Sequence, residues 1–427
     1  MCGRTLESRE PHQEGIEIMK ILHTADWHIG KLLEGKSRLE EQRIVLRQLV
    51  RMAQKNHADV VCVAGDIYDN GHPSAAAESL FYETIKELSQ DGNRLVVIIA
   101  GNHDQPSRLE AVTPLVKEHG IILYGTPKSM IPSGTYGSFE IQSLDKGVFT
   151  FTKNGERAVF ACVPYFSERT LNEVLYSEEI DHEERAGEYT QKAAELFQKR
   201  ASWFSPDSIN IFMSHVFTLG SAGDGSEQGM MLGNSYLLPA DVFPKSAQYI
   251  ALGHVHRPQK VPGSSGQIRY SGSPLPYRLT ESSVAKQCLL AELHPGEAPV
   301  VTELFFDNPK PIEKWVCRDY GEALEKCRKN KDRSCYVYLS VHTDSYIREE
   351  QLKELKSWKE DLIEIIPLFS SEEKESMEQD FRQMSFEELF ISYYTEKKGV
   401  KPQQEVLETL AEILEKENDH ETGTDEN

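Results

Sequence analysis

Short apolar runs alternate with helical patterns along the first half of the chain. A capping-box pattern at Ser37 predicts a helix start, and Leu46, Leu49 and Val50 follow at helical spacing. Residues 75–89 predict a second helix. The apolar runs are nearly continuous, which is typical of strands buried on both faces. The runs are residues 21–22, 60–63, 95–99, 121–123, 159–163, 209–213 and 249–252.

The order strand, helix, strand, helix predicts βαβ units, with helices covering a sheet. The pattern becomes less regular after about residue 161, where residues 168–200 predict an acidic helical insertion. Residues 268–270 and 288–293 predict further strands, which favours a second sheet packed on the first. We therefore expect an α/β fold (α+β by some schemes) built as a two-sheet sandwich flanked by helices.

Four parts are expected along the chain. Residues 1–18 are polar and precede the first credible strand, which indicates a disordered extension or a misassigned start. Residues 19–307 carry the sheet pattern. Residues 308–370 begin with a proline-rich linker and predict a small α+β domain. Residues 371–427 predict helices followed by an acidic tail.

Composition narrows the class of protein. The chain has 427 residues, of which 39% are hydrophobic, and no apolar run approaches the length of a membrane span. Its seven cysteines form no CxxC pair, and Cys62, Cys162 and Cys288 lie inside apolar runs. These features predict reduced cysteines in a cytoplasmic protein that does not enter a membrane.

The net charge of −21 disfavours a broad basic surface for nucleic acid. Residues 371–427 hold 17 acidic and 6 basic side chains, so this end accounts for about half of the imbalance. A polyanionic substrate would have to be held by metal ions, by local Lys and Arg side chains, or by a partner.

Polar segments follow directly on five of the apolar runs. In sheets with helical crossovers, ligands bind beyond the carboxyl ends of the strands, so these segments are expected to share one site. They carry the oxygen and nitrogen donors that divalent metals accept. The segments are Asp26-Trp27-His28, Gly65-Asp66, Gly101-Asn102-His103-Asp104, Ser214-His215 and Gly253-His254-Val255-His256.

Phosphodiester hydrolysis is the reaction that this donor set suits. Two divalent ions about 3.5–4 Å apart activate water and neutralise developing charge. Asp66 is the natural bridge between two ions, and the remaining candidate ligands are Asp26, His28, Asn102, His215, His254 and His256. His103 is free to contact the transition state or act as a general acid, and Asp104 could orient it. Singly, Asp26 or Asp66 could be a turn residue, but five independent coincidences are improbable.

These segments resemble the calcineurin-like metallophosphoesterase superfamily, whose pattern runs D-x-H, G-D, G-N-H-D/E, H and G-H-x-H. Their flanks resemble more narrowly the SbcD family of bacterial nuclease subunits. The flanking matches are MKILHTADWHIGK (19–31), GDIYD (65–69), GNHDQPSR (101–108), ALGHVHRPQ (251–259) and YSGSP (270–274).

The resemblance implies a ligand set for each of two manganese ions, with magnesium as the alternative. Asp26, His28, Asp66 and His256 would hold one ion. Asp66, Asn102, His215 and His254 would hold the other, and His103 would be the transition-state histidine. Asp69 would lie beside the ligands or toward the substrate.

The resemblance also implies a DNA nuclease, exonucleolytic on duplex ends and endonucleolytic on hairpins or single strands. Such subunits work in DNA repair, recombination and replication. They form a homodimer within a heterotetramer with SbcC, an SMC-like ATPase, in the cytoplasm at the nucleoid. The small domain would cap the DNA. This chain has no GxxxxGK[ST] loop, so ATP dependence would come from that partner.

An apolar stripe near the C-terminus predicts docking to the partner. Its side chains recur at helical spacing in a charged segment, where exposure would cost roughly 1.5–3 kcal/mol each. The stripe consists of Phe386, Leu389, Phe390, Tyr393 and Tyr394.

Several alternatives remain open from the residues alone. The same core could serve a small-molecule phosphodiesterase or nucleotidase, or a scaffold without catalysis. Trp27 is expected to pack in the core rather than stack on substrate. Arg108 and Arg257, just beyond metal-binding segments, could each clamp a phosphate or be an ordinary solvated arginine.

Overall fold

The computed structural model describes most of the chain in two compact units. The first unit extends to Glu313 and includes residues 334–336, and the second contains the rest. For residues 182–188 only the backbone is described. The described residues are 18–153, 155–167, 182–222, 237–264, 267–344 and 346–369, with isolated positions between 385 and 410.

One sheet of the first unit has six strands in the order β16-β15-β1-β4-β5-β6. Strands β1, β4, β5 and β6 are parallel, whereas β15 runs antiparallel to β1 and β16 antiparallel to β15. The bounds are β1 (Met19–Thr24), β4 (Val60–Ala64), β5 (Leu95–Ile99), β6 (Ile121–Tyr124), β15 (Gln287–Leu293) and β16 (Val300–Phe305).

The other sheet has eight strands in the order β13-β14-β12-β11-β10-β9-β8-β7. Its strands β10, β11, β12 and β14 are parallel. The bounds are β7 (Gly134–Tyr136), β8 (Phe139–Asp145), β9 (Val148–Lys153), β10 (Glu156–Val163), β11 (Ile209–His215), β12 (Tyr249–Gly253), β13 (Gln259–Lys260) and β14 (Ile268–Tyr270). A separate short hairpin joins β2 (Leu32–Leu33) to β3 (Lys36–Ser37).

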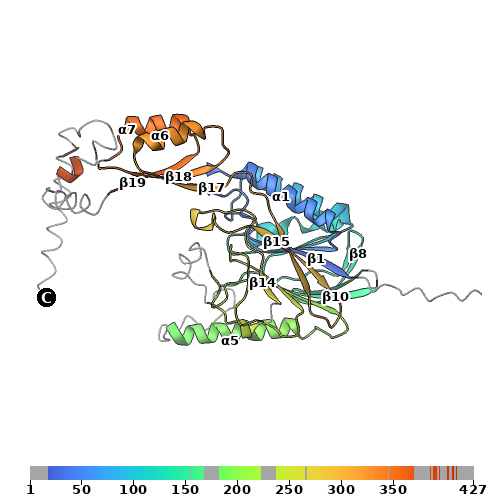
Figure 1. The fold of residues 1–427 in the computed structure, drawn as a ribbon. Coiled ribbons are helices and arrows are strands. Elements are labelled where there is room, and N and C mark those ends of the chain that lie inside the picture. The colour runs from blue at the N-terminus through green and yellow to red at the C-terminus, as the bar shows by residue number, and fades with distance from the viewer. Residues whose placement is uncertain are drawn as a thin grey trace, which may run out of the picture. The chain divides into compact units, whose positions relative to one another are not determined.

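Helices cover the outer faces of both sheets, with α1 and α5 on opposite sides of the pair (Figure 1). The longer helices are α1 (Leu39–Lys55), α2 (Ala75–Ser89) and α5 (His182–Ala201). The shorter ones are α3 (Pro106–Ala111), α4 (Thr113–Val116), η1 (Gln90–Gly92), η2 (Lys117–His119), η4 (Ala240–Val242) and η5 (Leu279–Glu281).

Three apolar clusters hold these layers together. Within β1, Leu22 faces α1 and α2 while Ile21 faces the second sheet, as the two-residue period of a strand requires. Phe212 of the second sheet packs on α5. Central strands such as β4 and β5 are buried at every position, which explains their continuous apolar runs. The predicted helix-flanked two-sheet sandwich is confirmed.

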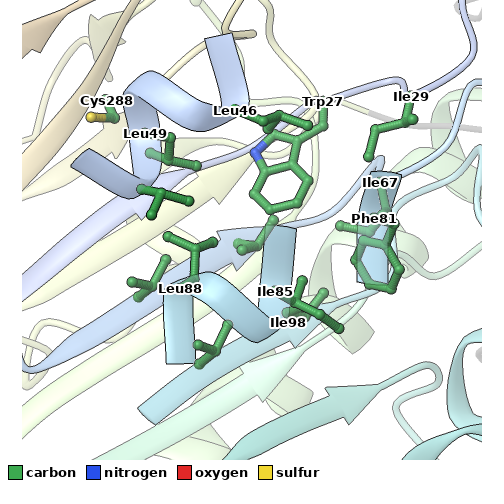
Figure 2. Packing of buried hydrophobic residues seen from close by; sticks show 14 of the residues in the cluster. Trp27, Ile29, Leu46, Leu49, Ile67, Phe81, Ile85, Leu88, Ile98 and Cys288 are labelled. Atoms are coloured by element: carbon green, nitrogen blue, oxygen red, sulfur yellow. The ribbon is translucent and has the colours of Figure 1, made fainter. Parts of the chain in front are cut away.

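Trp27 is a packing residue, as expected. Its side chain is 1% exposed and lies in the cluster between the six-stranded sheet and its helices, near Leu46 and Phe81 (Figure 2). The indole N–H donates to the Thr24 hydroxyl at 3.0 Å. Trp27 therefore anchors the loop that follows β1.

The predicted start of the first helix is wrong by one residue. Ser37 belongs to β3, and the residue that caps α1 is Arg38, which makes no side-chain capping hydrogen bond. Arg38 is fully buried and donates through Nη1 to the Pro276 carbonyl at 3.0 Å. Its tertiary contact thus outweighs the local capping preference.

The second unit is built around a three-stranded sheet in the order β17-β18-β19. Asp319 caps α6 by accepting a hydrogen bond from the Glu322 amide at 2.8 Å. Ala323 and Leu355, one from each helix, are fully buried. The bounds are β17 (Ile312–Cys317), α6 (Tyr320–Lys329), β18 (Tyr336–His342), α7 (Glu349–Trp358) and β19 (Leu362–Leu368).

Part of the apolar stripe near the C-terminus is described. Leu389, Phe390 and Tyr394 are helical and half-buried, and the Phe390 and Tyr394 rings lie 5.8 Å apart. Phe386 and Tyr393 lie outside the described residues, so the docking role of the stripe stays a prediction. Among the helices that the structure describes, none combines the length and the apolar character needed to cross a bilayer.

Candidate metal centre

The carboxyl ends of strands from both sheets meet at one place. Asp26 follows β1 and Asp66 follows β4, whereas His254 follows β12 of the other sheet. The His254 amide donates to Asp26 Oδ1 at 2.9 Å, and His215 Nδ1 lies 2.8 Å from the Ala64 carbonyl. These bonds join the two sheets, and all seven predicted ligands lie together there.

Four of the seven predicted ligands adopt left-handed backbone conformations. The φ angles are 54° for Asp26, 45° for His28, 52° for Asp66 and 100° for His254. Such conformations cost about 1–3 kcal/mol each in residues other than glycine, and they persist where the surrounding fold enforces them. The fold therefore holds these side chains in strained turns, which is a common property of functional sites.

Glycines beside the ligands leave no room for a side chain. A methyl group on Gly101 would collide with the Asp66 carboxylate and backbone nitrogen. One on Gly253 would collide with the Ala64 carbonyl, and one on Gly65 with the His215 ring. These positions require glycine because the neighbouring strands approach so closely.

One group of donors lies between the two sheets at the ends of β1 and β12. His28 Nε2 lies 3.0 Å from His256 Nε2 and 3.5 Å from Asp66 Oδ2. Asp26 Oδ2 is buried and has no hydrogen-bond partner among the described residues. Two imidazole nitrogens and an unpaired carboxylate oxygen at these spacings can bind a cation.

A second group surrounds the side-chain oxygen of Asn102. His215 Nε2 lies 3.0 Å from Asn102 Oδ1, and His254 Nδ1 lies 2.9 Å from it. His215 Nε2 is also 3.5 Å from Asp66 Oδ1. The two oxygens of Asp66 therefore face different groups, Oδ2 toward His28 and Oδ1 toward His215.

Burial and mutual charge set the protonation of the centre. Burial lowers the pKa of His28 well below its usual value and lowers the pKa of His254 to about 3. Burial raises the pKa of Asp26 to about 6. Burial would also raise the pKa of Asp66, but His215, His28 and His103 outweigh it and hold that pKa well below normal. Neutral imidazoles beside an ionised carboxylate are the forms that bind metals.

His215 behaves differently from the other histidines of the centre. Burial opposes its charge, but Asp66 and Asp26 outweigh burial and raise the pKa of His215 to about 9. Near neutral pH this ring therefore carries a proton that a metal ion would have to displace.

The donor set fits two divalent ions. Ligands at right angles on an ion with bonds of about 2.1 Å lie about 3 Å apart, which is the spacing seen within each group. The unpaired Asp26 oxygen and the two-sided Asp66 carboxylate supply negative charge among the imidazole and amide donors.

His103 lies at the edge of the centre and is half-buried. Its ring is 4.8 Å from the His28 ring, and its Nδ1 lies 2.7 Å from the Asp69 carbonyl oxygen. If Nδ1–H donates to that carbonyl, Nε2 is left for other partners. The Asp69 carboxylate pairs with Lys31 at 2.7 Å and lies 4.0 Å from His28 Nδ1.

Asp104 does not orient His103 as the sequence suggested. Its carboxylate accepts hydrogen bonds from the Ile67, Tyr68 and Gly101 amides at 2.8–3.1 Å. Burial, followed by the Asp66 charge, raises the pKa of Asp104 to about 6. The side chain therefore braces the loop that carries Asp66, while the Asp69 carbonyl orients His103.

Two arginines that the sequence left open as phosphate clamps or as ordinary solvated residues lie outside this donor set. Arg108, on α3, pairs with Glu78 of α2 at 2.8 Å, which is an intramolecular role. Arg257 follows His256 and is exposed. We find no ion pair for its guanidinium within the described part of the chain.

Supporting residues that the sequence did not reveal surround the ligands. Gln42 of α1 donates to the His28 carbonyl at 2.7 Å, and Tyr277 donates to the Trp27 carbonyl. Glu281 and Lys286 form a buried pair next to His256. The sequence did contain two signals for these supporting residues. Gln42 is a polar residue on the apolar face of the first helix, and Glu281 and Lys286 stand shortly before an apolar strand.

Comparison with known proteins agrees with this geometry. A family model described as calcineurin-like phosphoesterase matches residues 19–258, which include every predicted metal ligand. The chain belongs to the calcineurin-like phosphoesterase family. It is therefore a phosphodiester hydrolase, and the resemblance predicted from the motifs is confirmed. A second model, described as type 5 capsule protein repressor C-terminal domain, matches residues 308–398.

Curated relatives place this phosphoesterase more narrowly, in the family of the D subunits of the nuclease SbcCD. The relative of that name from Bacillus subtilis is 34% identical over 397 residues, covering 92% of this chain and 97% of its own. Relatives of the same name from Rhodobacter capsulatus and Staphylococcus epidermidis are 31% and 27% identical, each covering 78% of this chain and 82% of its own.

Two solved structures also align with this phosphoesterase. They are a protein of Thermus thermophilus and a dimetal phosphatase from Danio rerio, at 14% and 12% identity. Each covers 67% of this chain and 99% of its own, with TM-scores of 0.35 and 0.36.

Proposed function

We propose that this chain is the nuclease subunit of an SbcCD-type complex and hydrolyses DNA phosphodiesters at two Mn²⁺ ions. The observation that carries this proposal is the Asp66 carboxylate, whose two oxygens face two separate groups of donors. A shared carboxylate is what a two-ion site for phosphate esters needs. The name of the curated relatives supports DNA as the substrate.

In this proposal each ion has four protein ligands. Asp26, His28, Asp66 and His256 hold one ion, and Asp66, Asn102, His215 and His254 hold the other. When bound, such a pair of ions activates water and neutralises charge that develops on the phosphate. Mg²⁺ is the alternative ion. It is the less favoured of the two, because it prefers oxygen ligands and only part of this set is oxygen.

His103 is the catalytic residue in this proposal. The contact between its Nδ1 and the Asp69 carbonyl holds the ring in place at the mouth of the centre. When the ring is protonated at both nitrogens, Nε2–H can contact the scissile phosphate and donate its proton to the leaving oxygen, which leaves a neutral ring. Lys31, restrained by the Asp69 carboxylate, adds positive charge near that position.

The proposal also includes a partner protein that binds DNA and hydrolyses ATP. The net charge of −21 favours an additional DNA-binding surface, and an SbcC-like ATPase would supply it together with ATP hydrolysis. We place its docking site on the stripe of Phe386, Leu389, Phe390, Tyr393 and Tyr394.

The proposed assembly and substrate range are those of the SbcD family. Residues 308–370 would cap the DNA, and two copies of the chain would form a homodimer within a heterotetramer. The complex would act at the nucleoid as an exonuclease on duplex ends and an endonuclease on hairpins or single strands.

The test uses the purified full chain with Mn²⁺, Mg²⁺ or a chelator, and two substrates. Linear duplex DNA reports nuclease activity, and bis-p-nitrophenyl phosphate reports phosphodiester hydrolysis on a small ester. Manganese-dependent loss of DNA supports the proposal. Hydrolysis of the small ester alone would indicate a small-molecule phosphodiesterase, and inactivity on both with two ions bound would indicate a scaffold.

A further inference from the structure

We propose that the buried pair of Lys286 and Glu281 positions His256 and thereby fixes the geometry of one of the two metal sites. This inference rests on the proposed two-ion function. Neither residue points into the donor groups, so both would act through His256 and neither is a catalytic residue.

Lys286 has every ammonium hydrogen matched to an acceptor. Its Nζ lies 3.0 Å from the His256 carbonyl, 2.9 Å from Ser273 Oγ and 2.5 Å from Glu281 Oε2. The Lys286 side chain is 5% exposed and that of Glu281 is 2% exposed. An ammonium group removed from water in this way is costly unless it is paired and fully hydrogen-bonded, as it is here.

Glu281 connects the pair to the ligand ring. Its Oε1 lies 3.3 Å from His256 Nδ1, on the side of the ring away from the site. A carboxylate that accepts from Nδ1–H leaves His256 Nε2 unprotonated, which is the form that binds a metal. That Nε2 is the atom 3.0 Å from His28 Nε2.

The pair also links the two sheets. Lys286 directly precedes β15, which pairs with β1, and β1 leads into Asp26 and His28. His256 follows β12 of the other sheet, and its carbonyl accepts from Lys286 and from the Ser273 amide at 3.2 Å. Lys286 therefore ties the His256 backbone to the sheet that carries the opposing ligands, while Glu281 holds the His256 ring.

A purely structural ion pair makes different predictions. Replacing both partners of a buried pair by apolar residues of similar size is often neutral for stability, because no unpaired charge remains. If the pair served stability alone, such a double variant would leave metal affinity untouched, whatever its effect on the melting temperature. If it positions His256, metal affinity falls even where the fold is retained.

The experiment compares two double variants of the full chain by calorimetric titration with Mn²⁺. In Glu281→Met/Lys286→Met, His256 loses its acceptor, and we expect one of the two sites to bind about 10- to 100-fold more weakly. In Glu281→Gln/Lys286→Met, an amide oxygen can still accept from His256 Nδ1, so the part of the affinity that depends on the His256 ring should return, whereas the part that depends on the Lys286 contact to the His256 carbonyl should not. The other site should change little in both variants.

Arg200→Met is the matched control. Arg200 has the same 5% side-chain exposure, pairs with Asp145 at 3.0 Å and donates to the Pro127 carbonyl, with no contact to the ligands. Its variant should lose thermal stability and keep both Mn²⁺ affinities. Wild-type affinity at both sites in Glu281→Met/Lys286→Met, or equal weakening in the control, would overturn the positioning role. Failure of the wild-type chain to bind two ions would instead overturn the proposed function.

Discussion

Substitution of Gly101 by alanine tests whether one carboxylate serves both ions. The added methyl group would lie inside van der Waals contact of Asp66 Oδ1 and of the Asp66 backbone nitrogen. The backbone atom cannot rotate away, so the loop carrying Asp66 must shift. Because the Asp66 oxygens face both donor groups, a shift of this residue disturbs both sites together.

The size of the effect follows from the cost of overpacking. Extra methyl groups forced into packed interiors cost about 1–3 kcal/mol. Strain of that size in the metal-bound state corresponds to about 5- to 150-fold weaker binding. We expect both Mn²⁺ affinities of Gly101→Ala to fall within this range, with a matching loss of phosphodiesterase activity at limiting Mn²⁺.

Gly71→Ala is the control for this experiment. A methyl group there would meet the Gln105 Cβ at 3.4 Å, which is ordinary contact, and Gly71 does not have a positive φ. Calorimetric titration with Mn²⁺, together with thermal unfolding in a chelator, separates metal binding from stability. If Gly101→Ala is folded and weakens only one of the two sites, Asp66 is not shared between them and the two-ion assignment fails.

Three further predictions concern the proton-donating role of His103, the pH dependence of Mn²⁺ binding and the docking of the partner protein. His103→Ala should lower hydrolysis of bis-p-nitrophenyl phosphate by about 10²–10⁴-fold with Mn²⁺ content unchanged, and loss of metal would make His103 a ligand instead. Since the pKa of His215 is raised to about 9, Mn²⁺ binding at pH 7.5 should release about one proton and tighten as pH rises toward 9. Titration in buffers of different ionisation enthalpy measures this, and zero release would refute it. Truncation after Ser370 should abolish binding of an SbcC-like protein in a pull-down and spare Mn²⁺-dependent hydrolysis; retained binding would refute the docking stripe.

The metal ligands could be predicted from the sequence because each of them is marked by its immediate neighbours in the chain. A polar residue directly after a buried strand identifies a strand end without knowledge of the tertiary fold, and parallel strands place such ends along one edge. Asp26, Asp66 and His254 could be selected on that basis. The sequence did not show that they adopt left-handed backbone, or that His254 donates its amide to Asp26.

The predictions that failed depend on partners distant in the chain. Asp104 lies beside His103 in sequence, but its carboxylate turns toward the amides of Ile67 and Tyr68, 36–37 residues away. For Arg108 the sequence left a phosphate clamp and an ordinary solvated role both open, and its ion pair with Glu78 arises because α3 approaches α2. Neither contact has a sequence pattern of its own, since each depends on how two elements pack.

The strained turns of the centre are held by anchors in the surrounding fold. Four ligands in left-handed backbone would relax if their loops were free, at about 1–3 kcal/mol each. Trp27 prevents this between Asp26 and His28, because its buried indole fixes the loop between two ligands to the helical layer. Asp104 does the same for the Asp66 loop through backbone hydrogen bonds. These anchors hold the ligands in place from outside the donor set, so the affinity for metal ions should depend on the anchors as well as on the ligands themselves.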